Sequence, residues 1–121
     1  MIVTEDILHI HSYYSPNDLY NKIINGLNKL GKDVSKVTLD DLQPVDEFHI
    51  RGDAATKELI ELAEFAPHMH ILDVGCGIGG STRRLSYETG CRVTGIDLSN
   101  EYIDTAERLT QLLNMQEQVT F

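Results

Sequence analysis

Basic residues are scarce in this chain of 121 residues, where 10 lysines and arginines stand against 19 aspartates and glutamates and the net charge is −9. Proteins that bind nucleic acid or anionic membranes concentrate lysine and arginine on the binding surface. The charge balance therefore argues against both as main partners, and small molecules are the partners that we expect.

Long apolar runs are also missing. No stretch approaches the roughly 18 residues that a membrane-spanning helix needs. Residues 1–10 include two acidic residues and lack the basic segment that opens a secretory signal. The sequence therefore predicts a cytoplasmic protein that does not interact with membranes.

Cysteine is rare, with Cys76 and Cys91 as its two occurrences. A disulfide is not expected in a reducing compartment, and two cysteines without a spacing motif do not indicate a metal site. Histidine pairs occur at residues 9–11 and 68–70, but neither pair is accompanied by a third ligand at metal-binding spacing. The sequence predicts no bound metal.

The most informative stretch that is present is HILDVGCGIGG at 70–80. Its apolar start predicts a short strand buried on both faces, and the glycines that follow predict a tight turn into a helix. Glycine permits positive φ and a close approach of a ligand to the main chain, while the start of the next helix offers unpaired N–H groups. We expect a ligand at this turn.

The glycine spacing by itself fits two cofactors. Gly75, Gly77 and Gly80 satisfy the G-x-G-x-x-G fingerprint of dinucleotide-binding proteins. Asp73, at the end of the strand, would repel a pyrophosphate by roughly a kcal/mol or more. It would attract an ammonium, so it favours S-adenosylmethionine, which carries an α-ammonium and a sulfonium, over NAD.

A second strand is predicted at 92–97, so the strand, helix and strand form a βαβ unit with parallel strands. Asp97 lies 22 positions after Gly75, close to the roughly 20 expected of an acid that holds ribose hydroxyls. NAD enzymes and S-adenosylmethionine enzymes share this role, so Asp97 indicates an adenosine ligand without distinguishing them. Leu98 follows where it can pack on the adenine.

DVGCGIGG at 73–80, followed by GCRVTGIDLS at 90–99, resembles the nucleotide-binding half of class I S-adenosylmethionine-dependent methyltransferases. The resemblance implies an α/β fold, with about three strands of a doubly wound, Rossmann-like parallel sheet preceded by N-terminal helices. It implies S-adenosylmethionine as the cofactor. The residues expected at the cofactor are Asp73, Gly75, Cys76 through its backbone, Gly77, Gly79, Asp97 and Leu98.

VDEFHIRGDAATKELIELA at 45–63 resembles a segment of one methyltransferase branch, the small-molecule N-methylating enzymes of the glycine and sarcosine type. The resemblance implies a small-molecule methyl acceptor. Arg51, beside His49, is a candidate for the methionine carboxylate because a guanidinium pairs well with a carboxylate, and Tyr14 is a candidate for a lid over the cofactor. A surface arginine and a tyrosine that packs on the next helix remain the alternatives.

The division expected along the chain is a helical lid segment at 1–44 and the first half of the cofactor-binding domain at 45–121. Helices are predicted at 16–30, at 81–89 and from Ser99 to about Asn114, and a third strand is predicted at 119–121. Residues 32–44 are predicted to be a polar connector with one helical turn before Pro44. A helix capped near Asp53 is expected to turn Ala55, Leu59, Leu62, Ala63 and Ala66 inward.

Because the chain stops where a third strand begins, we expect a fragment that is inactive alone. The strand that would pair with the other edge of the first strand is missing, so we expect that edge to be covered by the N-terminal segment, by a second copy of the chain through self-association, or by neighbours in a crystal. The acceptor site would lie in later sequence, so no catalytic residue is predicted. Two other hypotheses stay open: the nucleotide-binding domain of an NAD-dependent oxidoreductase, and a binding module without turnover.

Overall fold

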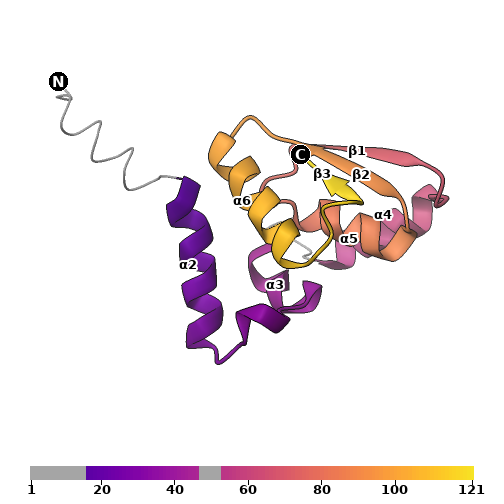
Figure 1. The fold of residues 1–121 in the computed structure, drawn as a ribbon. Coiled ribbons are helices and arrows are strands. Elements are labelled where there is room, and N and C mark those ends of the chain that lie inside the picture. The colour runs from indigo at the N-terminus through magenta and orange to yellow at the C-terminus, as the bar shows by residue number, and fades with distance from the viewer. Residues whose placement is uncertain (1–15, 47–52) are drawn as a thin grey trace, which may run out of the picture.

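The computed structural model describes residues 16–46 and 53–121, which form an α/β unit (Figure 1). Within these residues three α-helices and a 3-10 helix come first, and from β1 onward strands and helices alternate as the sequence pattern predicts. In chain order the elements are α2 (Pro16–Lys29), the 3-10 helix η1 (Val34–Lys36), α3 (Leu39–Asp46), α4 (Asp53–Ala63), β1 (His70–Val74), α5 (Gly80–Thr89), β2 (Arg92–Ile96), α6 (Asn100–Leu112) and β3 (Val119–Thr120).

The three strands form one parallel sheet in the order β1-β2-β3. His70 lies opposite Arg92 and Val74 opposite Ile96, so β1 and β2 end level with each other. The carboxyl ends of the strands therefore meet at one edge of the sheet, where the glycine turn begins. The predicted βαβ unit and the α/β fold class are confirmed.

One face of the sheet is covered by helices. Leu85 of α5, Cys91 and Val93 of β2 form a buried cluster, against which Ile60 of α4 and Phe65 pack. On the opposite face Leu72 and Val74 are 60% and 72% exposed. The prediction that β1 is buried on both faces is therefore wrong for the described part of the chain, because its helices pack on one face alone (Figure 1).

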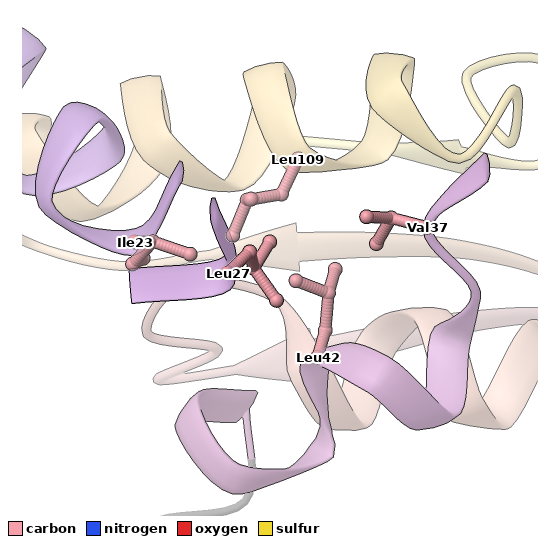
Figure 2. Packing of buried hydrophobic residues seen from close by; sticks show 5 residues of the cluster. All are labelled: Ile23, Leu27, Val37, Leu42 and Leu109. Carbon is pink, nitrogen blue, oxygen red and sulfur yellow. The ribbon is translucent and has the colours of Figure 1, made fainter. Parts of the chain in front are cut away.

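A second cluster joins the N-terminal helices to α6 (Figure 2). Ile23 and Leu27 of α2 meet Leu42 of α3 and Leu109 of α6, with Val37 beside them. Residues expected to form a polar connector thus contribute two buried side chains. The division of the chain near residue 44 stays a prediction.

Helix α2 ends as its sequence predicts. Gly31 has a φ of 76°, and the N–H groups of Gly31 and Lys32 donate to the carbonyls of Asn28 and Leu27 at 3.0 Å each. This pair of bonds is the Schellman arrangement, which satisfies carbonyls left open at the end of a helix. Leu30, which the prediction of a helix at 16–30 includes, lies beyond the helix and is exposed.

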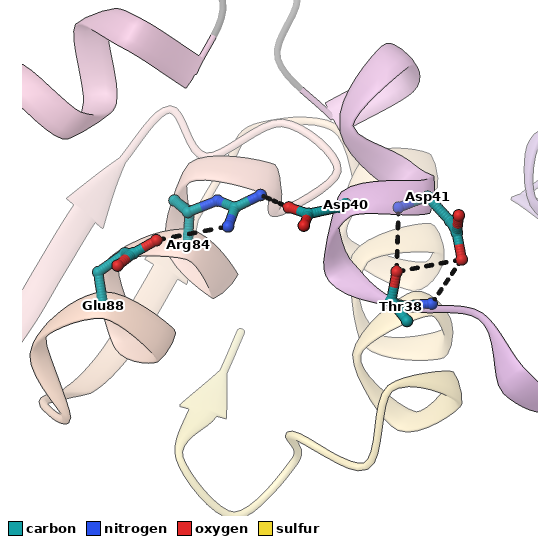
Figure 3. A network of polar contacts seen from close by, with 5 residues as sticks. All are labelled: Thr38, Asp40, Asp41, Arg84 and Glu88. Carbon is teal, nitrogen blue, oxygen red and sulfur yellow. Dashed lines mark hydrogen bonds and ion pairs between the residues drawn. The ribbon is translucent and has the colours of Figure 1, made fainter.

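Helix α3 corrects the prediction of a single turn before Pro44, because the helix continues through Pro44 to Asp46. A proline inside a helix removes one main-chain hydrogen bond. The start of the helix is closed by Thr38 and Asp41: the Thr38 N–H donates to Asp41 at 3.0 Å and the Asp41 N–H donates to the Thr38 hydroxyl at 3.3 Å (Figure 3). The buried side chain of Leu42 then holds the helix in place.

The predicted inward face of α4 is wrong. Leu59 and Leu62 are exposed, while Thr56 is buried and Ile60 packs on the cluster under the sheet. Thr56 and Ile60 are four residues apart and therefore lie on one side of the helix. Apolar residues lie on more than one side of the helix, and packing against α5 buries the side that carries Thr56 and Ile60.

No helix among residues 16–46 and 53–121 combines the length and the apolar character needed to cross a bilayer.

Candidate functional site

The glycine turn between β1 and α5 is held against the end of the neighbouring strand. The N–H groups of Gly75 and Cys76 both donate to the carbonyl of Ile96, at 2.8 and 3.0 Å. Gly75 and Gly77 have φ angles of 74° and 57°, a region that residues with a Cβ rarely adopt. Main-chain hydrogen bonds to β2 thus hold the turn in a defined shape.

Asp97, at the end of β2, closes the turn from the other side. Its Oδ2 accepts from the Gly77 N–H and its Oδ1 from the Ser99 N–H, each at 2.9 Å. These main-chain donors, Ser99 first and then Gly77, lower the pKa of the Asp97 carboxyl. Asp97 is therefore ionised at neutral pH. Each of its oxygens can still accept a further hydrogen bond, since a carboxylate has about four acceptor positions.

Two cavities meet at Gly75. The larger, of about 540 Å³, lies between the glycine turn and the N-terminal helices and is lined by Leu19, Ile23, Val45, Asp46, Gly75, Cys76, Gly77, Ile78, Ser81 and Tyr102. The smaller, of about 350 Å³, is lined by Val74, Gly75, Ile96, Asp97 and Leu98. Leu98 is fully exposed, with an apolar side chain free to pack on a ligand. Together the cavities can take an extended molecule that crosses the main chain of the turn.

Asp73 lines neither of these two cavities. Its Oδ2 accepts from the Thr82 hydroxyl at 2.8 Å, which ties the end of β1 to the first turns of α5. Its charge nevertheless reaches the turn, because it is one of the groups that raise the pKa of Cys76. Asp73 therefore acts on the turn through its field and through the position of α5.

The Cys76 thiol is buried, and its pKa is raised to about 11 by that burial first and then by the charges of Asp73 and Asp97. A thiol with such a pKa is protonated at neutral pH and is a poor nucleophile. Cys76 can therefore serve a ligand only through its main chain and its bulk.

Gly79 is a packing position. A Cβ on it would lie 2.5 Å from the Phe121 ring and 2.9 Å from the Arg83 guanidinium. Gly79 lines neither cavity, and its contact with the cofactor stays a prediction. The expected contacts Arg51 and Tyr14, with His49, lie outside the described residues.

Sequence reasoning missed Arg83, which is fully buried and pairs with Asp46 at 2.6 Å. The two residues are 37 positions apart. Their only local signal is an arginine in a helix just after a glycine turn, and nothing in the sequence names its partner. The larger cavity also depends on residues from α2 and α6, namely Leu19, Ile23 and Tyr102.

In the described ranges no three side chains of histidine, cysteine, aspartate or glutamate gather in a way that would hold a metal ion.

The chain is similar to known methyltransferases in sequence and in fold. Residues 71–121 match the family described as "Methyltransferase domain". A phosphoethanolamine N-methyltransferase 1 of Zea mays is 46% identical over 48 residues, which are 40% of this chain and 10% of that protein. An O-methyltransferase of Pyrenophora dematioidea is 28% identical over 101 residues, which are 84% of this chain and 36% of that protein.

Among solved structures, the geranyl diphosphate C-methyltransferase of Streptomyces coelicolor A3(2), in complex with Mg²⁺, geranyl-S-thiolodiphosphate and S-adenosyl-L-homocysteine, has a TM-score of 0.54 and 30% identity. The similarity covers 57% of this chain and 25% of that one. The chain thus spans between 10% and 36% of the length of these relatives.

Proposed function

We propose that residues 71–121, which match the family described as "Methyltransferase domain", form part of a class I S-adenosylmethionine-dependent methyltransferase, and that the protein binds S-adenosylmethionine at the glycine turn and methylates a small molecule. The observation that supports this most is the bond from the Gly77 N–H to Asp97. It brings a ribose-binding carboxylate to a glycine turn whose main chain is open to a ligand, between two cavities that meet at Gly75.

The adenosine end of the cofactor fits the smaller cavity. Asp97 is ionised and can accept from both ribose hydroxyls while it keeps its two main-chain donors. Leu98 offers an exposed apolar surface for the adenine. Burial of the Leu98 side chain against the adenine would contribute to affinity by removing apolar surface from water.

The amino-acid end fits the larger cavity, beside the main chain of Gly75, Cys76 and Gly77. The charges of Asp73 and Asp97 both act on this turn, as their effect on the Cys76 thiol indicates. A negative field favours a sulfonium and an ammonium over a diphosphate. Arg51 as a partner of the methionine carboxylate, and Tyr14 as part of a lid, are proposals made from the sequence.

S-adenosylmethionine, when bound, would supply a methyl group on a sulfonium sulfur that can be transferred to a nucleophilic nitrogen, oxygen or carbon of the acceptor, with a neutral thioether as the leaving group. The contribution of this chain is to orient the methyl group and to keep water from it. The turn would hold the amino-acid end and Asp97 would hold the ribose, and together they would restrict the motion of the cofactor between these two contacts. No residue of the chain is proposed as a general base.

The acceptor is proposed to be a small molecule, in keeping with the relatives, whose names include phosphoethanolamine and geranyl diphosphate methyltransferases. The acidic composition supports a protein that does not bind nucleic acid or membranes. A cytoplasmic location is likewise a prediction made from the sequence.

Isothermal titration calorimetry on the complete protein tests the proposal. We expect saturable binding of S-adenosylhomocysteine and no measurable heat with NADH. Asp97→Asn should weaken S-adenosylhomocysteine roughly tenfold or more, because a charge-assisted hydrogen bond contributes about 1.5–3 kcal/mol. Saturable binding of NADH without S-adenosylhomocysteine would instead support the nucleotide-binding domain of an oxidoreductase.

A further inference from the structure

Arg83 joins three helices inside the protein. Its guanidinium is fully buried and bonds to Asp46 of α3 at 2.6 Å. It also donates to the Ala106 carbonyl at 3.3 Å and to the Thr110 hydroxyl at 3.1 Å, both on α6. Because Arg83 itself belongs to α5, its side chain fixes the positions of α3, α5 and α6 relative to one another.

These contacts lie next to Gly79 and Gly80, where the glycine turn leads into α5. The Arg83 N–H donates to the Gly79 carbonyl at 3.0 Å, so the residue forms part of the first turn of α5. A Cβ on Gly79 would meet the guanidinium, and a Cβ on Gly80 would meet the main chain of Asp46. Gly80 therefore permits the close approach of Asp46 to the turn, and Gly79 permits that of the Arg83 guanidinium together with the Phe121 ring.

The pair also sets one wall of the larger cavity. Val45 and Asp46 of α3 line it, facing the turn residues Gly75 and Ile78. Leu42, on the same short helix, packs on α2 and α6, so the position of α3 also governs that of α2. The smaller cavity is lined by no residue of α3. A shift of α3 would therefore change the larger cavity and leave the smaller one in place.

A buried ion pair by itself is weak evidence for stability, because desolvation of the two charges offsets most of their attraction. The Asp46 side chain is 3% exposed and that of Arg83 is 0% exposed, so here the desolvation is nearly complete. The function of such a pair is better sought in the geometry that it imposes.

We propose that Arg83 is a positioning residue for the cofactor: through Asp46 it holds α3 against the glycine turn and so shapes the cavity that takes the amino-acid end of S-adenosylmethionine. The proposal rests on the proposed function. It requires that loss of the pair affects ligands with an amino-acid end more than ligands that end at the ribose.

Arg84 provides a matched control. Its guanidinium is also buried and also joins α5 to α3, through Asp40 at 2.8 Å, with Glu88 at 3.5 Å as a second partner (Figure 3). Asp40 is exposed, however, and neither Arg84 nor Asp40 lines either of the two cavities. Arg84→Met therefore removes a comparable link between the same helices at a distance from the turn.

The experiment measures the dissociation constants of S-adenosylhomocysteine and of 5′-methylthioadenosine, which lacks the amino-acid end, for the complete protein. We expect Arg83→Met and Asp46→Asn each to raise the dissociation constant of S-adenosylhomocysteine at least tenfold and that of 5′-methylthioadenosine less than twofold. Arg84→Met should leave both dissociation constants unchanged. Urea denaturation of every variant reports stability. If Arg83→Met does not fold, Asp46→Asn, which keeps the size of the side chain, decides the outcome.

Equal losses for both ligands, no loss for either, or the same selective loss in Arg84→Met would overturn the positioning role. A wild-type protein that does not bind S-adenosylhomocysteine at all would instead overturn the proposed function, and the positioning role with it. The two failures are distinguishable because the second appears before any substitution is made.

Discussion

At the scale of a residue, Asp97 has one contact role that the structure shows and one that is proposed. The sequence predicted a carboxylate for ribose hydroxyls, and the structure adds that the same carboxylate bonds the main chain of Gly77 and Ser99. If the proposed ribose contact holds, the ligand site and the local fold depend on the same charge. A change at Asp97 should affect the empty protein as well as its affinity for a cofactor.

The pH dependence of stability tests this. The folded pKa of Asp97 is lowered by its main-chain donors, so its contribution to stability is present above the unfolded pKa of about 3.9 and is lost as pH falls through the folded value. We expect the free energy of unfolding of Asp97→Asn, measured in urea between pH 7 and pH 2.5, to fall less on acidification than that of the wild type.

Glu117→Gln, in the turn before β3, controls for the loss of one carboxylate. It should retain the full acid-induced fall seen in the wild-type protein. Identical acid profiles for Asp97→Asn and the wild type would show that the main-chain bonds do not stabilise the fold.

At the scale of an element, β2 contains a glycine, Gly95, where two other side chains approach its main chain closely. A Cβ on Gly95 would lie 2.8 Å from the Cys76 sulfur and 2.8 Å from the Phe121 ring. The glycine thus permits the turn and the C-terminal residue to meet over the middle of the strand. The sequence pattern of a strand does not reveal this close contact, because by that pattern glycine only weakens a strand.

Gly95→Ala should lower the free energy of unfolding by about 1–3 kcal/mol, the usual range for overpacking. The same substitution at Gly26, within α2 and with nothing within 4 Å of the added Cβ, should raise it by about 0.5–1 kcal/mol because alanine favours a helix over glycine. Urea denaturation of both variants measures the difference. Equal stability of the two would contradict the contact.

Over the whole molecule, the sheet has one covered face and one exposed apolar face, on which Leu72, Val74 and Ile96 lie. Within the described residues β1 is also an edge strand. Large exposed apolar patches and unpaired strand edges favour association. We therefore propose that the 121-residue chain, produced alone, associates with itself through this side of the sheet.

Sedimentation velocity over a hundredfold range of concentration checks the proposal. The chain should show a rising average mass, and Leu72→Lys should shift it toward the monomer because a charge in the contact is costly to bury. Leu62→Lys, on the exposed side of α4, should leave the association unchanged. A monomer at every concentration would exclude the contact.

The sequence by itself determined the strand, the glycine turn, the second strand and the spacing from Gly75 to Asp97. These features follow from local rules: apolar runs make strands, glycine permits positive φ, and parallel strands bring their ends to one edge. Tertiary structure alone decided that Thr56 and Ile60 face inward instead of Leu59 and Leu62, and that Arg83 finds Asp46. These contacts depend on which surfaces of the helices pack together in the folded protein. Residues far apart in the chain form them, so no local sequence pattern predicts them.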